Sequence, residues 1–334
     1  MVRLSILDQT VIPEGSTAQV EIENTTRLAQ IAERLGYHRF WMAEHHLETS
    51  GHSSPEILIP HVASKTTTIR VGSGGVMLPN YSAYKVAENF RLLEALYPGR
   101  IDLGVGRAPG GIPLATMALQ ENRDEMVDRF PQQMDDLIHY LTGSKKQSHR
   151  FKGLKAMPDI NTCPELWVLG SSGGSAGLAA KKGVSYAFAQ FISGQHGGNI
   201  VASYHDSYSS SEIQTQPNAM VGFFVVCAST DREAEQLAAS LDVHFLQISK
   251  GEKTGGIQPP AQAIKYPFSN KDYQIIMENR KKVLVGSPKT IKQQIEKLSK
   301  EYQAEEFILT SMIYDFHAKV KGYQLLAREF ELIK

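Results

Sequence analysis

Eight short apolar runs, separated by longer segments with helical spacing, constrain the fold of this chain more than any other feature. Such alternation is typical of repeated strand–helix units built around a parallel sheet. Eight is the number of strands that closes a (β/α)8, or TIM, barrel. We therefore predict an α/β fold, a (β/α)8 barrel formed as a single domain over residues 1–334. The runs cover residues 4–8, 39–43, 69–78, 101–106, 166–170, 186–190, 221–228 and 307–313.

Two segments interrupt the alternation. Residues 144–163 are rich in Lys, Ser and Gly, and residues 249–272 contain Gly-Gly and Pro-Pro pairs, so we interpret both as insertions. Long loops in compact domains often cover binding sites. The second insertion is therefore a candidate cover of an active site, and a plain surface loop is the alternative. After it, Ser287-Pro288 predicts a further helix over residues 287–301, because serine caps free amides and proline fits the first turn.

The charge balance argues against a polyanionic partner. Lys plus Arg and Asp plus Glu each number 35, which leaves no basic footprint for a nucleic acid or an anionic membrane. Cys163 and Cys227 are too few and too far apart for a disulfide framework or a metal site, which fits a reducing cytoplasm. No export signal begins the chain, and no long apolar window predicts a membrane span. We expect a cytoplasmic protein with a small-molecule partner.

Serine and glycine gather where the fifth run ends and a helix is predicted over residues 175–182. Ser171, Ser172 and Ser175 can donate hydrogen bonds there, and the helix start directs unpaired N–H groups and a positive dipole end at a ligand. A serine-capped helix start without a ligand is the alternative. Arg107 follows the neighbouring fourth run, so both groups can bind one phosphate. We predict a phosphate site here.

Gly74 and Gly75 stand inside the third run, where each glycine costs roughly 0.5–1 kcal/mol relative to alanine. We expect a flat ligand that approaches closely, or a backbone bulge or strained peptide. A kink at a corner of the barrel is the alternative.

The second run is followed by His45 and His46, which point to opposite faces if the strand continues. At most one of them then faces the mouth of the barrel. The remaining histidines show no spacing typical of metal ligands, so we predict no metal site.

These motifs together resemble the bacterial-luciferase-like flavin-dependent monooxygenases, in their single-polypeptide branch. The resemblance rests on LGYHRFWMAEHH (35–46), RVGSGGVMLP (70–79), LYPGRIDLGVGRAPG (96–110) and LGSSGGSA (169–176), and it extends over nearly the whole chain. It implies a barrel that binds FMN at its carboxyl-terminal mouth, where reduced flavin and O2 form a C4a-peroxide that oxidises a small organic substrate.

The resemblance also implies roles for single residues. Gly74 and Gly75 match a non-proline cis peptide under the flavin ring, and His45 matches a catalytic histidine beside it. The phosphate ligands are matched by Arg107, Ser171, Ser172 and Ser175, and less closely by Arg123. Gly106 replaces the reactive cysteine of the light-emitting enzyme, so we do not expect bioluminescence.

Two other functions fit the same barrel. One is hydride transfer with the deazaflavin F420, and the other is flavin binding without catalysis. As partners, the resemblance implies a separate flavin reductase that supplies reduced FMN, together with assembly into a homo-oligomer.

Overall fold

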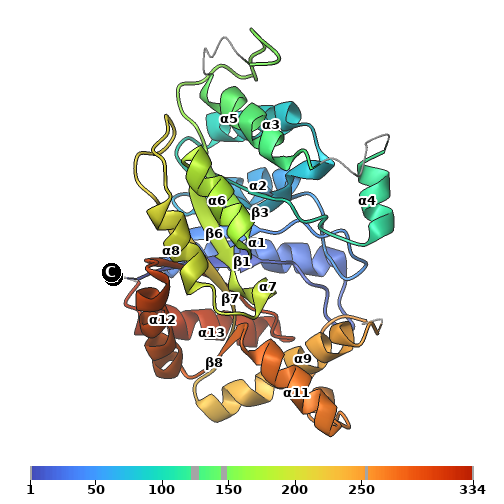
Figure 1. Ribbon diagram of the computed structural model, residues 1–334. Helices are drawn as coiled ribbons and strands as arrows, with labels where there is room; N and C mark the ends of the chain where they lie inside the picture. The colour runs from blue at the N-terminus through green and yellow to red at the C-terminus, as the bar shows by residue number, and fades with distance from the viewer. Residues whose placement is uncertain (1, 122–127, 144–148, 253–254, 333–334) are drawn as a thin grey trace.

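The structure is a computed structural model that describes residues 2–121, 128–143, 149–252 and 255–332. Within these ranges one parallel sheet contains nine strands, and helices surround it (Figure 1). The strands are β1 Arg3–Asp8, β2 Arg39–Met42, β3 Arg70–Met77, β4 Ile101–Gly106, β5 Glu165–Gly170, β6 Ser185–Ala189, β7 Ala219–Cys227, β8 Val283–Gly286 and β9 Glu306–Thr310.

Eight of these strands close into a ring, which confirms the predicted barrel. The sheet runs from β6 back through β1 to β9 and β7, and pairing between β6 and β7 closes it. The ninth strand, β8, was not predicted. It pairs with the last residues of β7, from Phe224 to Cys227, where β7 extends beyond its pairing with β6. An apolar run of four residues is too short to identify such an added strand from its pattern.

The helices follow the strands, and short ones occupy several of the loops. The helix predicted over 287–301 is confirmed as α12, where the Ser287 side chain accepts a hydrogen bond from the Thr290 amide. The helix predicted from Ser175 begins two residues earlier, at Gly173. The helices are α1 Ala18–Arg34, α2 Pro55–Ser64, η1 Leu78–Asn80, α3 Ala83–Leu96, α4 Pro113–Leu119, α5 Phe130–Thr142, α6 Gly173–Lys182, α7 Gln190–Ser193, α8 Gly198–Asp206, α9 Asp231–Ser249, α10 Pro260–Ala263, α11 Asn270–Arg280, α12 Pro288–Tyr302 and α13 Phe316–Glu329.

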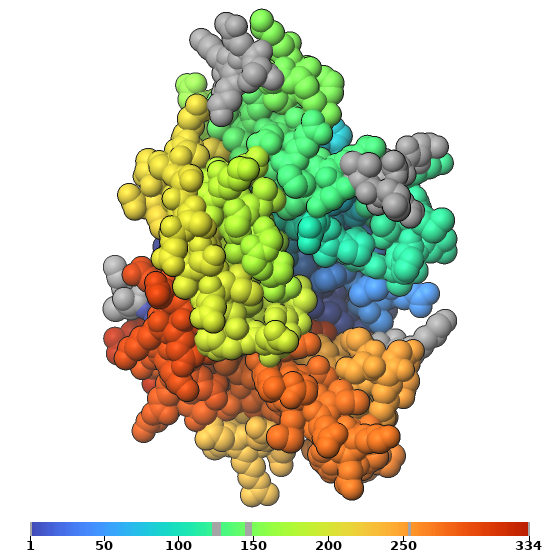
Figure 2. Space-filling view, in the orientation of Figure 1, coloured from blue at the N-terminus to red at the C-terminus, as the bar shows by residue number. Residues whose placement is uncertain are grey.

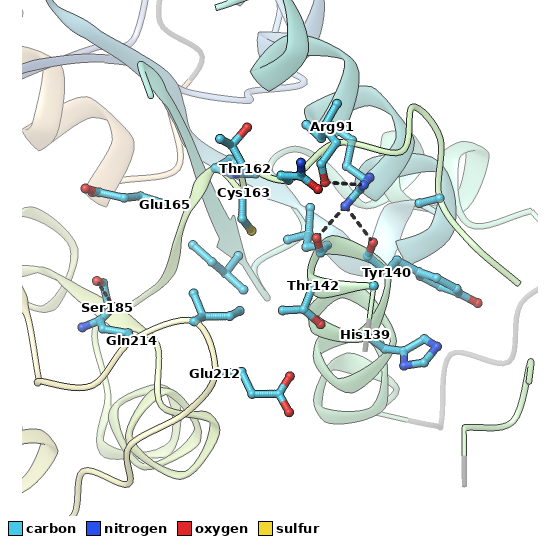
Figure 3. A pocket seen from close by; sticks show the side chains of 18 of the residues that line it. Arg91, His139, Tyr140, Thr142, Thr162, Cys163, Glu165, Ser185, Glu212 and Gln214 are labelled. Atoms are coloured by element: carbon cyan, nitrogen blue, oxygen red, sulfur yellow. Dashed lines mark hydrogen bonds between the residues drawn. The ribbon is translucent and has the colours of Figure 1, made fainter. Parts of the chain in front are cut away.

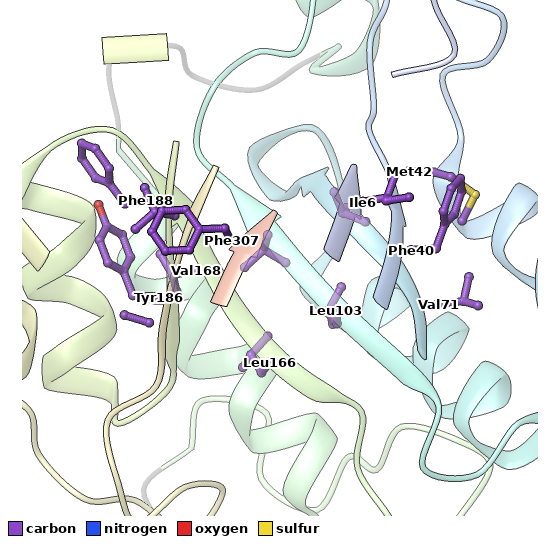
Figure 4. Packing of buried hydrophobic residues seen from close by; sticks show 14 of the residues in the cluster. Ile6, Phe40, Met42, Val71, Leu103, Leu166, Val168, Tyr186, Phe188 and Phe307 are labelled. Atoms are coloured by element: carbon purple, nitrogen blue, oxygen red, sulfur yellow. The ribbon is translucent and has the colours of Figure 1, made fainter. Parts of the chain in front are cut away.

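Side chains alternate between the barrel interior and the layer of helices, as the period of a strand requires. Trp41 and Trp167 pack edge to face in an interior cluster, with ring centroids 5.6 Å apart. Their neighbours Phe40 and Val168 belong to the larger cluster under the helices (Figure 4). On the face drawn in Figure 2, yellow-green, yellow and orange atoms of the second half of the chain form much of the surface, and dark blue atoms near the N-terminus are visible between them.

A buried charge cluster lies at the amino-terminal end of the barrel. Arg39, only 1% exposed, donates from Nε to Glu306 at 2.6 Å and from Nη1 to Asp102 at 2.7 Å. The Trp41 indole also donates to Asp102, at 2.8 Å. These contacts join β2, β4 and β9, so the cluster stabilises this end of the barrel.

The described part of the first insertion, residues 149–163, is tied to the barrel by another buried arginine. Arg91 of α3 donates to the carbonyl oxygens of Leu141 at 2.6 Å, Pro158 at 2.9 Å and Ile160 at 3.2 Å. One guanidinium therefore joins the end of α5 to the insertion.

Candidate active site at the carboxyl ends of the strands

The structure brings Arg107 to the same level of the barrel as residues 170–175, here called the serine turn, which lead from β5 into the first turn of α6. Strands β4 and β5 are neighbours, with Val105 opposite Val168, so Arg107 and Gly170 each lie two residues beyond a paired position. Ser171 and Ser172 follow Gly170 directly. Both segments therefore leave the sheet side by side, as the predicted phosphate site requires.

The serine turn opens helix α6 with amides that a ligand can use. Ser172 is the N-cap residue, and its side chain makes no capping hydrogen bond. A Cβ atom added at Gly173 would meet nothing within 4 Å, so the space above the first turn is open. Free N–H groups and the positive end of the helix dipole favour an anion at such a position.

Two residues that the sequence analysis missed touch these groups. The Tyr186 hydroxyl, from β6, lies 3.3 Å from the Gly170 carbonyl oxygen and 3.4 Å from that of Ser172. Arg107, whose side chain is 62% exposed, pairs at 3.4 Å with Asp128. Nothing in the local sequence around either residue signals these contacts, because both partners come from distant segments.

The peptide bond between Gly74 and Gly75 is cis, and the register between β3 and β4 shifts between Gly74 and Val76. The register shift shows that a bulge, one of the alternatives expected for this pair, is present. A Cβ atom at Gly75 would lie 2.8 Å from the Gly104 carbonyl oxygen, and one at Gly74 would lie 2.7 Å from Leu7. The Gly104 backbone thus leaves no room for a side chain at Gly75, whereas at Gly74 the close contact is with the end of the Leu7 side chain. Contact of either glycine with a flavin remains a prediction.

His45 lies beyond the end of β2, which stops at Met42, so the strand alternation assumed for His45 and His46 does not apply. The His45 ring hydrogen-bonds the Gly110 carbonyl. Burial lowers the pKa of His45, and this hydrogen bond opposes the shift only in part. His45 is therefore a neutral imidazole at pH 7.

His46 contacts Glu44, a residue to which the sequence pattern assigned no role. Nε2 of His46 lies 2.9 Å from Oε1 of Glu44, and the Tyr81 hydroxyl donates to the same oxygen at 3.0 Å. The Met77 amide donates to the other carboxylate oxygen at 2.9 Å. Glu44 thus joins the segments that follow β2 and β3, which fixes the loop that carries His45.

The second insertion packs at this same end of the barrel. The Glu14 amide, in the loop after β1, donates to the Ile257 carbonyl at 3.0 Å. The Ile257 side chain is only 2% exposed and belongs to an apolar cluster with Met312 and Ile313 of the loop after β9. This position suits a cover of the mouth, and opening or closing of the segment remains a prediction.

A pocket of about 1170 Å³ lies at the opposite end of the barrel (Figure 3). Glu165 and Ser185, the first residues of β5 and β6, line it together with Arg91 and Cys163. Active sites of (β/α)8 barrels lie at the carboxyl ends of the strands. We therefore place the chemistry at the mouth and not in this pocket.

Arg123, the weaker phosphate candidate, lies outside the described residues. Among the residues that the structure does describe, no group of three or more His, Cys, Asp or Glu side chains is arranged to hold a metal ion. None of the helices in the same ranges is both long and apolar enough to span a bilayer.

Comparison with known proteins agrees with this arrangement. The sequence model of the luciferase-like monooxygenase family matches residues 2–304. The chain belongs to this family. It is 46% identical to protein YwcH of Bacillus subtilis (strain 168) over 99% of both chains. It is also 38% identical to the N-acetyl-S-alkylcysteine monooxygenase of the same organism, over 98% of both chains.

Three solved structures share the fold. The crystal structure of apo-MsnO8 has a TM-score of 0.90 and 35% identity, and the match covers 99% of each chain. The oxygenating constituent of 3,6-diketocamphane monooxygenase from Pseudomonas putida, solved with FMN, has a TM-score of 0.70 at 18% identity and 98% coverage of both chains. An F420-dependent secondary alcohol dehydrogenase also has a TM-score of 0.70, at 12% identity, covering 100% of this chain and 99% of the other. The last two likenesses establish the fold alone.

Proposed function

We propose that this protein is a monooxygenase that uses reduced FMN and O2 to oxidise a small organic substrate. The observation that carries the proposal is the position of Arg107 and of the serine turn of α6 at the ends of neighbouring strands. Bound reduced flavin would supply the activation of O2. The chain itself would bind the cofactor, orient it and keep water from it.

The donor set fits the phosphate of FMN. An exposed guanidinium, serine hydroxyls and free helix amides are all donors, and a phosphate group only accepts hydrogen bonds. In this proposal Arg107, Ser171, Ser172 and Ser175 hold the phosphate, with Arg123 as a further candidate. Gly74 and Gly75 would lie under the flavin ring.

His45 would serve as a hydrogen-bond or proton acceptor. One of its ring nitrogens faces the Gly110 carbonyl, which can only accept, so that nitrogen carries a proton. In the neutral ring the second nitrogen then has a free lone pair. It can hold the cofactor or accept a proton from the reacting groups.

Turnover should therefore fall at acid pH. The pKa of His45 is lowered from 6.5 by burial, so the neutral ring persists below that pH and is lost only as the pH falls through the lowered value. We expect the acidic limb of the rate against pH to lie below 6.5 and to disappear in His45→Gln. His38→Gln is the matched control, because burial also lowers the pKa of His38. His38 precedes Arg39, the first residue of β2, and so lies at the opposite end of the strand from His45. A limb above 6.5, or one that persists in His45→Gln, would contradict this role.

The cofactor is tested by anaerobic titration of the purified protein with FMN, reduced FMN and reduced F420. We expect tighter binding of reduced FMN than of the oxidised form, followed by oxygen-dependent turnover of a substrate panel. Preferential binding of F420 would replace monooxygenation by hydride transfer. Flavin binding without turnover of any substrate would indicate a flavin carrier.

The substrate and partners follow from the same proposal. A relative is named for its action on N-acetyl-S-alkylcysteine, so thioethers of this size belong at the head of the substrate panel. We also propose that a separate reductase supplies reduced FMN and that the protein assembles as a homo-oligomer in the cytoplasm.

A further inference from the structure

The hydroxyl of Tyr186 is a buried polar group for which the proposed chemistry has no use. Its side chain is 0% exposed, and the residue belongs to β6, beside the strand that ends in the serine turn (Figure 4). The hydroxyl lies 3.3 Å from the Gly170 carbonyl and 3.4 Å from the Ser172 carbonyl. It therefore lies against the backbone of the turn from inside the fold.

Ser175 meets the same carbonyl. Its hydroxyl donates to the Ser172 carbonyl oxygen at 2.9 Å, and the Ala176 amide donates to that oxygen at 3.3 Å. A carbonyl oxygen has two lone pairs, so the two nearer donors, Ser175 and Ala176, fill it while the Tyr186 hydroxyl lies at 3.4 Å. A serine hydroxyl has one proton, and Ser175 cannot donate to a phosphate while it donates to Ser172.

We propose that Tyr186 is a positioning residue that frees Ser175 to bind the flavin phosphate, an inference that rests on the proposed function. When the Ser175 hydroxyl turns to the phosphate, the Tyr186 hydroxyl replaces it as donor to the Ser172 carbonyl. The Ser172 carbonyl then keeps two hydrogen bonds, one from Tyr186 and one from the Ala176 amide, after the Ser175 hydroxyl has rotated away.

Two further features suit Tyr186 to this role. Burial raises the pKa of Tyr186 to about 12, so the hydroxyl keeps its proton throughout the working pH range. A Cβ atom at Gly170 would lie 2.0 Å from the Ser175 hydroxyl oxygen, so glycine at this position leaves the room that Ser175 occupies beside Tyr186.

The experiment compares the affinities for reduced FMN and reduced riboflavin, measured anaerobically by fluorescence quenching. The two ligands differ only in the phosphate, so their affinity ratio isolates the phosphate site. We expect Tyr186→Phe to lower the preference for reduced FMN about three- to tenfold, the usual effect of one neutral hydrogen bond. Riboflavin affinity and the melting temperature relative to the control variant should not change.

Tyr204→Phe is the matched control. Tyr204 is also 0% exposed, its hydroxyl donates to the Val184 carbonyl at 2.9 Å, and its ring packs 5.5 Å from that of Tyr186. Its hydrogen bonds do not involve the serine turn, so its loss should leave the affinity ratio unchanged. An equal fall in both variants would mean that Tyr186 acts only through core packing, which overturns the proposal.

A double mutant tests the route through Ser175. If Tyr186 acts by freeing Ser175, Tyr186→Phe should have no effect on the ratio in a Ser175→Ala background. An undiminished effect there would overturn the proposal, as would an unchanged ratio in Tyr186→Phe alone. A wild-type protein that binds both ligands equally would also overturn the phosphate site itself, which separates failure of the proposed function from failure of the role of Tyr186.

Discussion

Replacing Arg39 with leucine is expected to lower the free energy of unfolding by about 3–5 kcal/mol, because it leaves buried carboxylates without their cation. Asp102 and Glu306 are both 0% exposed. Burial opposes the charge of Glu306, and the Arg39 guanidinium outweighs it and keeps the pKa of that carboxyl below its usual value. Urea unfolding followed by circular dichroism measures the loss.

Arg3→Leu is the control for this prediction. Arg3 lies 3.8 Å from the same Glu306, but its side chain is 44% exposed, so water screens the pair. We expect a loss of less than about 1 kcal/mol. Equal losses in the two variants would show that burial of the Arg39 cluster contributes nothing beyond a surface ion pair.

Arg107→Ala is expected to weaken binding of reduced FMN about 10- to 100-fold. A hydrogen bond to a charged group is worth about 1.5–3 kcal/mol, and the high exposure of Arg107 places the effect toward the lower end. The affinity of Arg107→Lys for reduced FMN should lie between those of wild type and Arg107→Ala, because lysine keeps the charge and loses the forked geometry. Anaerobic titration measures all three affinities.

Riboflavin and a second arginine provide the controls. Reduced riboflavin lacks the phosphate, so its affinity should be the same in wild type and Arg107→Ala. Arg232 in α9 is also exposed. Arg232→Ala removes one positive charge, as Arg107→Ala does, and should leave the affinity for reduced FMN unchanged. A parallel loss of riboflavin affinity in Arg107→Ala would assign Arg107 to the flavin ring or to folding.

Structural features that depend on residues close together in the chain were predicted well from the sequence. The alternation of runs located the eight barrel strands, with ends that differ by at most three residues from those in the structure. Ser287 was identified as a helix cap, and a bulge was one of the structures expected at the glycine pair in β3. Each depends on side-chain period, a capping hydroxyl or a missing Cβ, which act over a few residues.

The candidate site was predicted only where it lies at strand ends. Arg107 and the serine turn could be placed together, because the order of strands in a barrel sets their neighbours. Glu44 and Tyr186 could not be given roles, because their partners come from other segments of the chain.

By itself, the sequence determined the barrel, the order of its strands and the polar residues at their carboxyl ends, because these follow from local periodicity and chain order. The contacts between distant segments were decided by closure of the sheet. It added β8 to the end of β7, gathered Arg39, Asp102 and Glu306 from three distant strands, and placed the Tyr186 hydroxyl against the serine turn. Such contacts depend on distances between residues far apart in the chain, which only the packed structure sets.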